Sequence, residues 1–170
     1  MTSASSGAGA AAVTLRPMTA ERFAAWLENS IGTFAEDLTK ATGQSLRDTS
    51  ARARQQYAEW LPGGVETDNA WLMTIVAGNG TEVGTFWLGP HPQRPDVAFG
   101  YDIEIHPEHR GRGLGRAAML AAEQLAREVG YTEIALNVFG FNEPARRLYD
   151  SLGYRVVSTQ MSKPLGTDDG

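Results

Sequence analysis

The first third of the chain has apolar residues at the three- and four-residue spacing of helices that bury one face. Thr19 can cap the first helix, whose apolar positions are Phe23, Trp26, Leu27, Ile31, Phe34 and Leu38. Residues 42–45 interrupt this pattern. A second helix follows and ends at the Pro-Gly-Gly sequence of residues 62–64, with apolar positions at Ala53, Tyr57, Trp60 and Leu61. The pattern therefore predicts two successive amphipathic helices.

The remaining sequence alternates apolar runs with turn signals, which is typical of strands joined by hairpins and helices. Residues 70–77 are almost wholly apolar, as in a strand buried on both faces, and Gly-Asn-Gly at 78–80 predicts a hairpin to residues 82–88. Three prolines predict a loop over residues 89–95. We expect further strands at residues 13–18, 97–106, 133–138 and 154–160, and helices at residues 114–129 and 142–152.

These elements predict one α/β domain over residues 13–164, in the order β-α-α-β-β-β-α-β-α-β. A mixed, mostly antiparallel central sheet flanked by helices satisfies this order. The β-α-β unit across residues 97–138 is expected to be a right-handed, parallel crossover. Residues 1–12 are rich in Ala, Ser and Gly and predict a disordered tail, and residues 165–170 predict a frayed end.

The sequence Arg-Gly-Arg-Gly-Leu-Gly-Arg at residues 110–116 lies where a predicted strand gives way to a predicted helix. Glycines at such a junction leave backbone N–H groups and the positive end of the helix dipole open to one spot, which suits a phosphate. The arginines add charge-assisted donors. The run therefore predicts a site for a pyrophosphate-bearing ligand, and a glycine-rich turn with solvated arginines is the alternative.

Two common phosphate-binding fingerprints do not fit this run. The dinucleotide pattern G-x-G-x-x-G read from Gly111 has Arg116 at its last glycine, and read from Gly113 it fails again. A P-loop requires Gly-Lys-Ser/Thr, which the sequence lacks. The spacing that fits is Arg-x-x-Gly-x-Gly, formed by Arg110, Gly113 and Gly115.

Composition narrows the class of protein further. The net charge of −5 argues against a general nucleic-acid partner, and the absence of cysteine excludes a cysteine nucleophile and thiolate metal sites. No apolar run approaches the roughly 20 residues that span a bilayer, so no membrane partner is expected. Residues 1–12 lack the basic region and apolar core of a signal peptide, so a cytoplasmic, bacterial-type enzyme is expected. His106 and His109 have no evident third ligand, so no metal site is expected.

A second motif lies near the C-terminus. Asn142 is a good helix N-cap, and the spacing of Asn142, Arg146 and Tyr149 predicts one polar stripe facing outward. Ala145, Leu148 and Leu152 form the neighbouring apolar stripe that is expected to pack on the sheet.

The two motifs together resemble the GCN5-related N-acetyltransferase (GNAT) superfamily. The residues that carry this resemblance are 101–110 with the glycine loop, and Asn137, Asn142, Ala145, Tyr149, Gly153 and Tyr154. The resemblance implies acetyl-CoA as cosubstrate and acetyl transfer directly to a primary amine, on a small molecule or at a protein α-amine. It also implies cosubstrate binding by Ile103, Ile105, Arg110, Gly111, Arg112, Gly113, Leu114, Gly115, Arg116, Asn137, Asn142 and Tyr149. Many such proteins form homodimers, which no residue here decides.

The chemistry requires a donor to the departing thiolate and a base for the amine. The resemblance places a general acid at Tyr149, and a tyrosine that only packs is the alternative. Asp102 and Glu104 are the candidate bases and share one side of a regular strand, while Tyr101, Ile103 and Ile105 share the other unless a bulge intervenes. A strand-edge salt bridge is the alternative role of each carboxylate. A catalytically silent acyl-CoA sensor is the alternative function.

Overall fold

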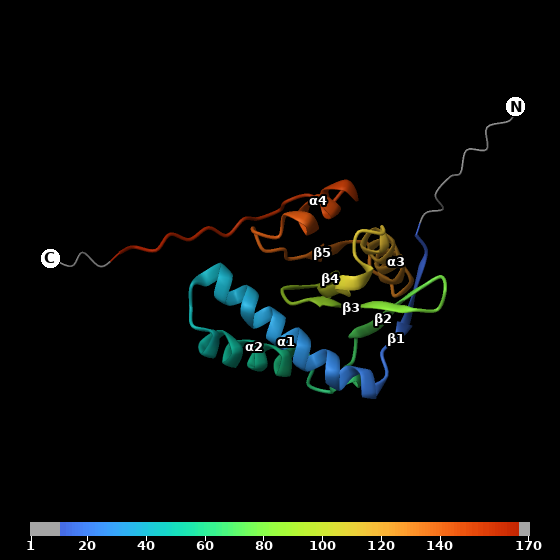
Figure 1. Cartoon of the computed structure of the whole chain (residues 1–170), viewed down its shortest axis with the longest axis horizontal. Helices are drawn as coiled ribbons and strands as arrows, with labels where there is room; N and C mark the ends of the chain where they lie inside the picture. The colour runs from blue at the N-terminus through green and yellow to red at the C-terminus, as the bar shows by residue number, and fades with distance from the viewer. Residues whose placement is uncertain (1–10, 167–170) are drawn as a thin grey trace, which may run out of the picture.

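In the computed structural model, which describes residues 11–166, a five-stranded sheet lies between helices on both faces (Figure 1). The strands lie in chain order, and neighbouring strands are antiparallel except the last two. They are β1 (Val13–Pro17), β2 (Trp71–Ala77), β3 (Glu82–His91), β4 (Arg94–Ile105) and β5 (Ile134–Leu136). The predicted mixed, mostly antiparallel sheet is confirmed. Most of the predicted N-terminal tail, residues 1–10, and residues 167–170 lie outside the described residues.

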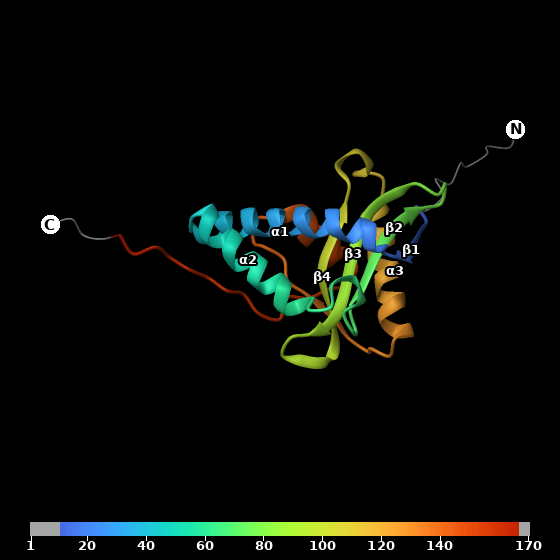
Figure 2. The same cartoon turned by 90° about the horizontal axis from the view of Figure 1, so that it is seen from below.

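Helices α1 (Ala20–Thr42) and α2 (Leu46–Trp60) cover one face, as the periodicity predicts (Figure 2). The Thr19 side chain accepts a hydrogen bond from the Arg22 N–H at 3.2 Å and so caps α1. Gly43 ends α1 in the left-handed conformation, with φ of 71°, which glycine adopts without steric cost. The buried core on this face includes Trp26, Ile31, Ala35, Ala53, Tyr57, Leu72 and Trp87.

Helix α3 (Leu114–Glu128) covers the opposite face, and the short helix α4 (Glu143–Ser151) lies on the same side (Figure 1). The core under α3 includes Ile75, Phe86, Leu88, Ala98, Leu114, Ala118 and Ala122. The Asn142 side chain accepts a hydrogen bond from the Ala145 N–H at 3.3 Å, which confirms the predicted N-cap of α4. Two 3₁₀ turns, Gly64–Glu66 and Pro107–His109, complete the helical elements.

The loop predicted over residues 89–95 is wrong, because β3 and β4 continue through most of it as a hairpin. Pro90 is paired with Ala98, and His91 with Arg94. The pairing of β2 with β3 ends at Leu88, so β2 has no residue opposite Pro90. A proline is tolerated there because its missing N–H removes no hydrogen bond to β2.

The strand predicted at residues 154–160 is also not formed. Residues 155–166, which we call the C-terminal arm, are extended and exposed, and both views show them running away from the body of the protein (Figures 1 and 2). The composition of the arm favours a strand, but a strand needs a partner strand, and the arm has none within residues 11–166.

Candidate functional site

The glycine loop forms the turn into α3 that its sequence predicts. Gly111 and Gly113 have φ values of 74° and 76°, in the left-handed region that favours glycine. Gly113 is the N-cap residue of α3 and provides no side-chain cap, so the first N–H groups of this helix remain available to a ligand. Gly115 has a different role, because a Cβ there would contact Leu148 and Ile105, at 3.5 and 3.9 Å.

Each of the three arginines of this loop makes a hydrogen bond that holds its side chain in place. Its positive charge remains available to a ligand. Arg110 Nε donates to the Ile105 carbonyl at 2.8 Å, Arg112 to the Glu108 carbonyl at 3.1 Å, and Arg116 to Ser151 Oγ at 2.9 Å. Within residues 11–166 none of the three forms an ion pair with a carboxylate. Their positive charge is therefore not neutralised by the protein itself, which suits binding of an anionic group.

β4 is paired along most of its length on one edge and is open over much of the other edge. On the β3 side its pairing runs to Ile105, whereas its parallel pairing with β5 covers only Ala98, Phe99 and Gly100. The predicted parallel relation of these strands is thus confirmed, but over three residues. Beyond Gly100, no strand within residues 11–166 pairs with this edge of β4.

The backbone groups on the open edge can be identified from the strand geometry. A Cβ on Gly84 of β3 would collide with the carbonyl of Glu104, so the Glu104 backbone faces β3. Since backbone groups alternate along a strand, Ile103 and Ile105 turn their N–H and C=O groups to the open edge. Arg110 occupies the Ile105 carbonyl from that side. The Ile105 N–H is left as a donor facing the opening.

Asp102 lies on the α1 face of β4, held by two donors. Its Oδ2 accepts hydrogen bonds from Trp26 Nε1 at 3.2 Å and from Ser30 Oγ at 3.0 Å, and Ser30 Oγ is also 2.8 Å from the Tyr57 hydroxyl. Burial raises the pKa of Asp102 above its usual value, and the bonds from Ser30 and Trp26 act in the opposite direction. A raised pKa makes this carboxylate a better proton acceptor than an ordinary aspartate.

Glu104 lies two residues further along the same face and accepts a hydrogen bond from Asn29 Nδ2 at 3.3 Å. The two carboxylates therefore share a side, as predicted, while Ile103 and Ile105 pack toward α3. The exception named for an irregular strand applies to Tyr101. A bulge between the pairs Trp87–Asp102 and Leu88–Gly100 inserts Tyr101 as an extra residue and turns it to the α1 face, where its ring stacks on Trp87.

Tyr149 is buried in α4, with 9% of its surface exposed, so the outward-facing phenol predicted from the helical spacing is wrong. Asn142 and Arg146 are exposed, as predicted. Burial raises the pKa of Tyr149, and the negative charge of Asp102 raises it further. Within the described chain the Tyr149 hydroxyl has no hydrogen-bond partner. The charge of Asp102 therefore acts on the Tyr149 phenol.

Comparison with known proteins shows the family of the chain. The model of the acetyltransferase (GNAT) family matches residues 34–154. The chain is 32% identical to the uncharacterized N-acetyltransferase YycN of Bacillus subtilis over 154 residues, which are 90% of this chain and 99% of YycN. The chain belongs to the GNAT family.

Solved structures agree with this assignment. The crystal structure of the putative acetyltransferase YycN from B. subtilis superposes with a TM-score of 0.85 at 31% identity, covering 91% of this chain and 99% of that one. A putative acetyl transferase from Pyrococcus furiosus shares the fold, with a TM-score of 0.65 at 20% identity. The mycothiol acetyltransferase of Saccharomonospora viridis is 30% identical over 130 residues, which are 73% of this chain and 40% of that protein.

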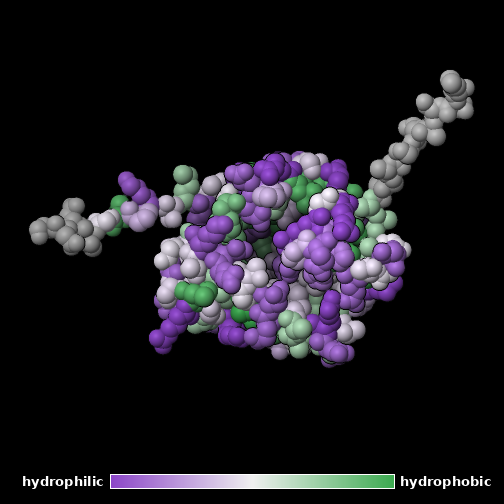
Figure 3. Space-filling view, in the orientation of Figure 1, coloured by the Kyte–Doolittle hydropathy of each residue, from purple (hydrophilic) through white to green (hydrophobic). Residues whose placement is uncertain are grey.

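The molecular surface is hollowed on the side of β5 and α4. Figure 3, in the orientation of Figure 1, shows this hollow between α1 and the segment that contains β5 and α4. Aromatic side chains connect its two sides: the Phe34 and Phe139 rings are 6.5 Å apart, and Lys40 Nζ lies 4.0 Å from the centre of the Phe141 ring. Asn137, directly after β5, is exposed in the same segment.

Sequence reasoning missed the residues that hold Asp102. Trp26 and Tyr57 read as core residues, and Ser30 was not singled out, although it is buried and polar. One signal was present: Ser30 falls four residues after Trp26 and four before Phe34, so it interrupts the apolar stripe of α1 with a hydroxyl.

No helix of residues 11–166 combines the length and apolar character needed to cross a membrane.

Proposed function

We propose that this GNAT protein transfers the acetyl group of acetyl-CoA directly to a primary amine at the open edge of β4. The observation that supports this most strongly is the convergence there of a cationic glycine loop, an unpaired stretch of strand, two carboxylates and a tyrosine. These groups suit a ligand with a pyrophosphate at one end and a thioester at the other.

Binding falls to the loop and the strand. The N–H groups at the start of α3, with Arg112 and Arg116, would hold the pyrophosphate. The backbone of Ile103 and Ile105 would pair with the amide-containing arm of the cosubstrate in place of a neighbouring strand. The Ile105 N–H would also stabilise the oxyanion that forms when the amine nitrogen attacks the thioester carbon. The other residues around the bound cosubstrate would be Gly111, Leu114, Gly115, Asn137 and Asn142.

Asp102 would act as the base that accepts the proton. Glu104 would attract the ammonium form of the acceptor by its negative charge. The amine must lose a proton as its nitrogen bonds to the acetyl carbon, and Asp102, with its raised pKa, would accept that proton directly or through one water. The carbon–sulfur bond then breaks, and the sulfur leaves with the electron pair.

Tyr149 would donate a hydrogen bond to that sulfur. At reference pKa values of about 10 for a phenol and about 8.5 for a thiol, full proton transfer is uphill by about 2 kcal/mol. The raised pKa of Tyr149 increases this cost while Asp102 is ionised. Once Asp102 has taken the proton of the amine, its charge is neutralised and the cost falls. The two steps are therefore coupled in the order that the reaction needs.

The test is thiol release from acetyl-CoA with polyamines, aminoglycosides, amino acids and peptides with free N-termini as acceptors. We expect release that depends on the amine and is lost in Tyr149→Phe and Asp102→Asn, while both variants still bind acetyl-CoA. Amine-independent background release across the panel, with intact acetyl-CoA binding, would favour the sensor function. Absence of acetyl-CoA binding would overturn the proposal.

A further inference from the structure

The middle of α1 holds the two carboxylates of β4. Ser30 donates a hydrogen bond to Asp102, and Asn29 donates one to Glu104. Asp102 is the base of the proposed acetyl transfer, so the reacting amine of the acceptor belongs beside this part of α1. The rest of the acceptor then follows a surface that begins here.

The second half of α1 borders the hollow that Figure 3 shows. The Phe34 ring of α1 lies 6.5 Å from the Phe139 ring across it, and Phe139 stacks on Phe141 at 5.4 Å. Phe34 and Phe139 are partly buried, and Phe141 is exposed. Rings with free surface favour a ligand that contains hydrocarbon, because contact removes apolar area from water.

Asp37 brings a negative charge to the same face of α1. It lies three residues after Phe34 and three before Lys40, and both of these neighbours reach the rings of residues 139–141. Asp37 is partly buried, and burial raises its pKa, an effect that the charge of Lys40 opposes. Among residues 11–166 it has no ion-pair partner. A partly buried carboxylate of this kind is stabilised by a bound cation.

The spacing of Ser30 and Asp37 sets the length of a ligand that reaches both carboxylates. The two residues are seven positions apart, close to two helical turns, so their side chains lie in one line about 10 Å apart along the helix axis. Phe34 lies between them. With C–C bonds of about 1.5 Å, two nitrogens joined by seven or eight extended methylene groups are separated by about the same distance.

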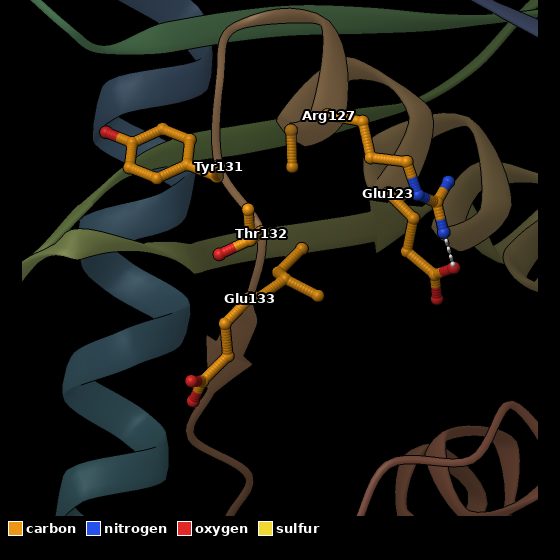
Figure 4. A pocket seen from close by; sticks show the side chains of 7 residues that line it. Glu123, Arg127, Tyr131, Thr132 and Glu133 are labelled. Atoms are coloured by element: carbon orange, nitrogen blue, oxygen red, sulfur yellow. Dashed lines mark hydrogen bonds and ion pairs between the residues drawn. The ribbon is translucent and has the colours of Figure 1, made fainter.

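The cavity between α3 and β5 shows what distinguishes the surface at Asp37. This cavity has a volume of about 90 Å³, and Figure 4 shows Glu123 and Arg127 on one side of it and Glu133 on the other. Both carboxylates are paired, Glu123 with Arg127 at 3.5 Å and Glu133 with Arg94 at 2.9 Å. Their charges are already balanced, so this cavity offers no comparable site for an ammonium group.

We propose that the acceptor is a long α,ω-diamine or polyamine, whose reacting amine lies at Asp102 and whose distal ammonium binds Asp37. Its methylene chain lies against Phe34 and Phe139. This inference rests on the proposed acetyl transfer and names the class of its acceptor. Asp37 binds the far end of the substrate and takes no part in proton transfer, so it determines specificity.

The first test compares thiol release from acetyl-CoA with α,ω-diaminoalkanes of increasing length and with n-alkylamines of the same carbon number. We expect kcat/KM to be highest at seven or eight methylene groups and about 10-fold above the matching monoamine, because the distal ammonium gains a charge-assisted hydrogen bond. An optimum at a shorter or longer chain, or diamines that are no better than monoamines, would overturn the inference.

Asp37→Asn tests the contact itself. We expect the ratio of kcat/KM for the best diamine to that for its monoamine to fall about 10-fold, to near one. Glu36→Gln is the matched control, because it removes the same charge from the next, exposed position of α1 and should keep the ratio. A ratio that survives Asp37→Asn, or that falls equally in Glu36→Gln, would contradict the role of Asp37.

Calorimetric binding of the best-fitting diamine separates this inference from the acetyl transfer on which it rests. If no amine is acetylated, the proposed transfer fails, and binding still decides the site at Asp37. Binding that Asp37→Asn weakens and Glu36→Gln does not would support the site, and absence of such binding would contradict it. Equal acetylation of monoamines and diamines would retain the transfer and remove this acceptor class.

Discussion

The two edges of β4 differ in how far each is paired with a neighbouring strand. On the β3 edge the pairing extends from Arg94 to Ile105, with irregularities at Tyr101 and between the pairs Pro90–Ala98 and His91–Arg94. On the β5 edge the pairing stops after Gly100, and no strand within residues 11–166 pairs with this edge over the next five residues. The same strand is therefore held rigidly on one side and left unpaired on the other. A site that must position a thioester within tenths of an ångström benefits from both, because the paired edge fixes the groups that the open edge presents.

We expect the largest effect from a substitution that damages the paired edge of β4. In Gly84→Val the new side chain meets the Glu104 backbone, which cannot rotate away, so we expect a loss of about 3 kcal/mol in the free energy of unfolding. Urea unfolding measures it. Gly32→Ala is the control: its Cβ would meet nothing within 4 Å on α1, and it should gain about 0.5–1 kcal/mol. A Gly84→Val protein as stable as wild type would mean that the two strands are not packed this closely.

Asp102→Asn removes the proposed base from the open edge, and we expect turnover to fall by about 10³ with little change in acetyl-CoA affinity. The free energy of unfolding distinguishes this loss of turnover from misfolding. Because burial raises the pKa of Asp102 in the folded protein above its unfolded value, the ionised form destabilises the fold at neutral pH. Wild type should gain stability relative to Asp102→Asn as pH falls through the raised pKa. Unfolding at several pH values measures this, and a gain with rising pH would contradict the assignment.

The Tyr149→Phe variant tests the contribution of α4 to the open edge of β4, since it removes only the hydroxyl. We expect turnover about 10²-fold lower and acetyl-CoA affinity unchanged. Steady-state kinetics and calorimetry provide the two readouts. Tyr131→Phe, at a tyrosine between α3 and β5, is the matched control and should behave like wild type. Unchanged turnover in Tyr149→Phe would remove Tyr149 from the mechanism.

Gly113→Ala tests the loop at the end of the open edge. A non-glycine residue in the left-handed conformation costs about 1–2 kcal/mol, so we expect acetyl-CoA to bind about 10-fold more weakly. Gly140→Ala is the control, because a Cβ there meets nothing within 4 Å and the backbone is not in the left-handed region. Equal affinities for the two variants would place the pyrophosphate elsewhere.

Ser30→Ala should have the smallest effect. It removes a hydrogen bond that lowers the pKa of Asp102, so the pKa rises further and the acidic limb of the pH–rate profile moves to higher pH. Thr33→Ala, at an exposed position of the same helix, should leave the limb in place. A limb that moves to lower pH would contradict the role of Asp102.

The sequence was sufficient where local rules decide the structure. The caps at Thr19 and Asn142 and the glycine loop before α3 depend on a few adjacent residues, and all were predicted correctly. Predictions failed where distant partners decide. The burial of Tyr149 depends on what α4 packs against. The side of Tyr101 depends on a bulge against β3, which the sequence could name only as an exception. Residues 154–160 have the composition of a strand, but composition does not provide the strand they pair with.

The most direct test of the account is hydrogen exchange of the β4 amides with and without acetyl-CoA. We predict that acetyl-CoA slows exchange in residues 101–106, at Ile105 above all, and leaves the β3 amides opposite them unchanged, because those are already paired. Binding of acetyl-CoA without added protection in residues 101–106 would contradict the claim that the open edge of β4 receives the cosubstrate.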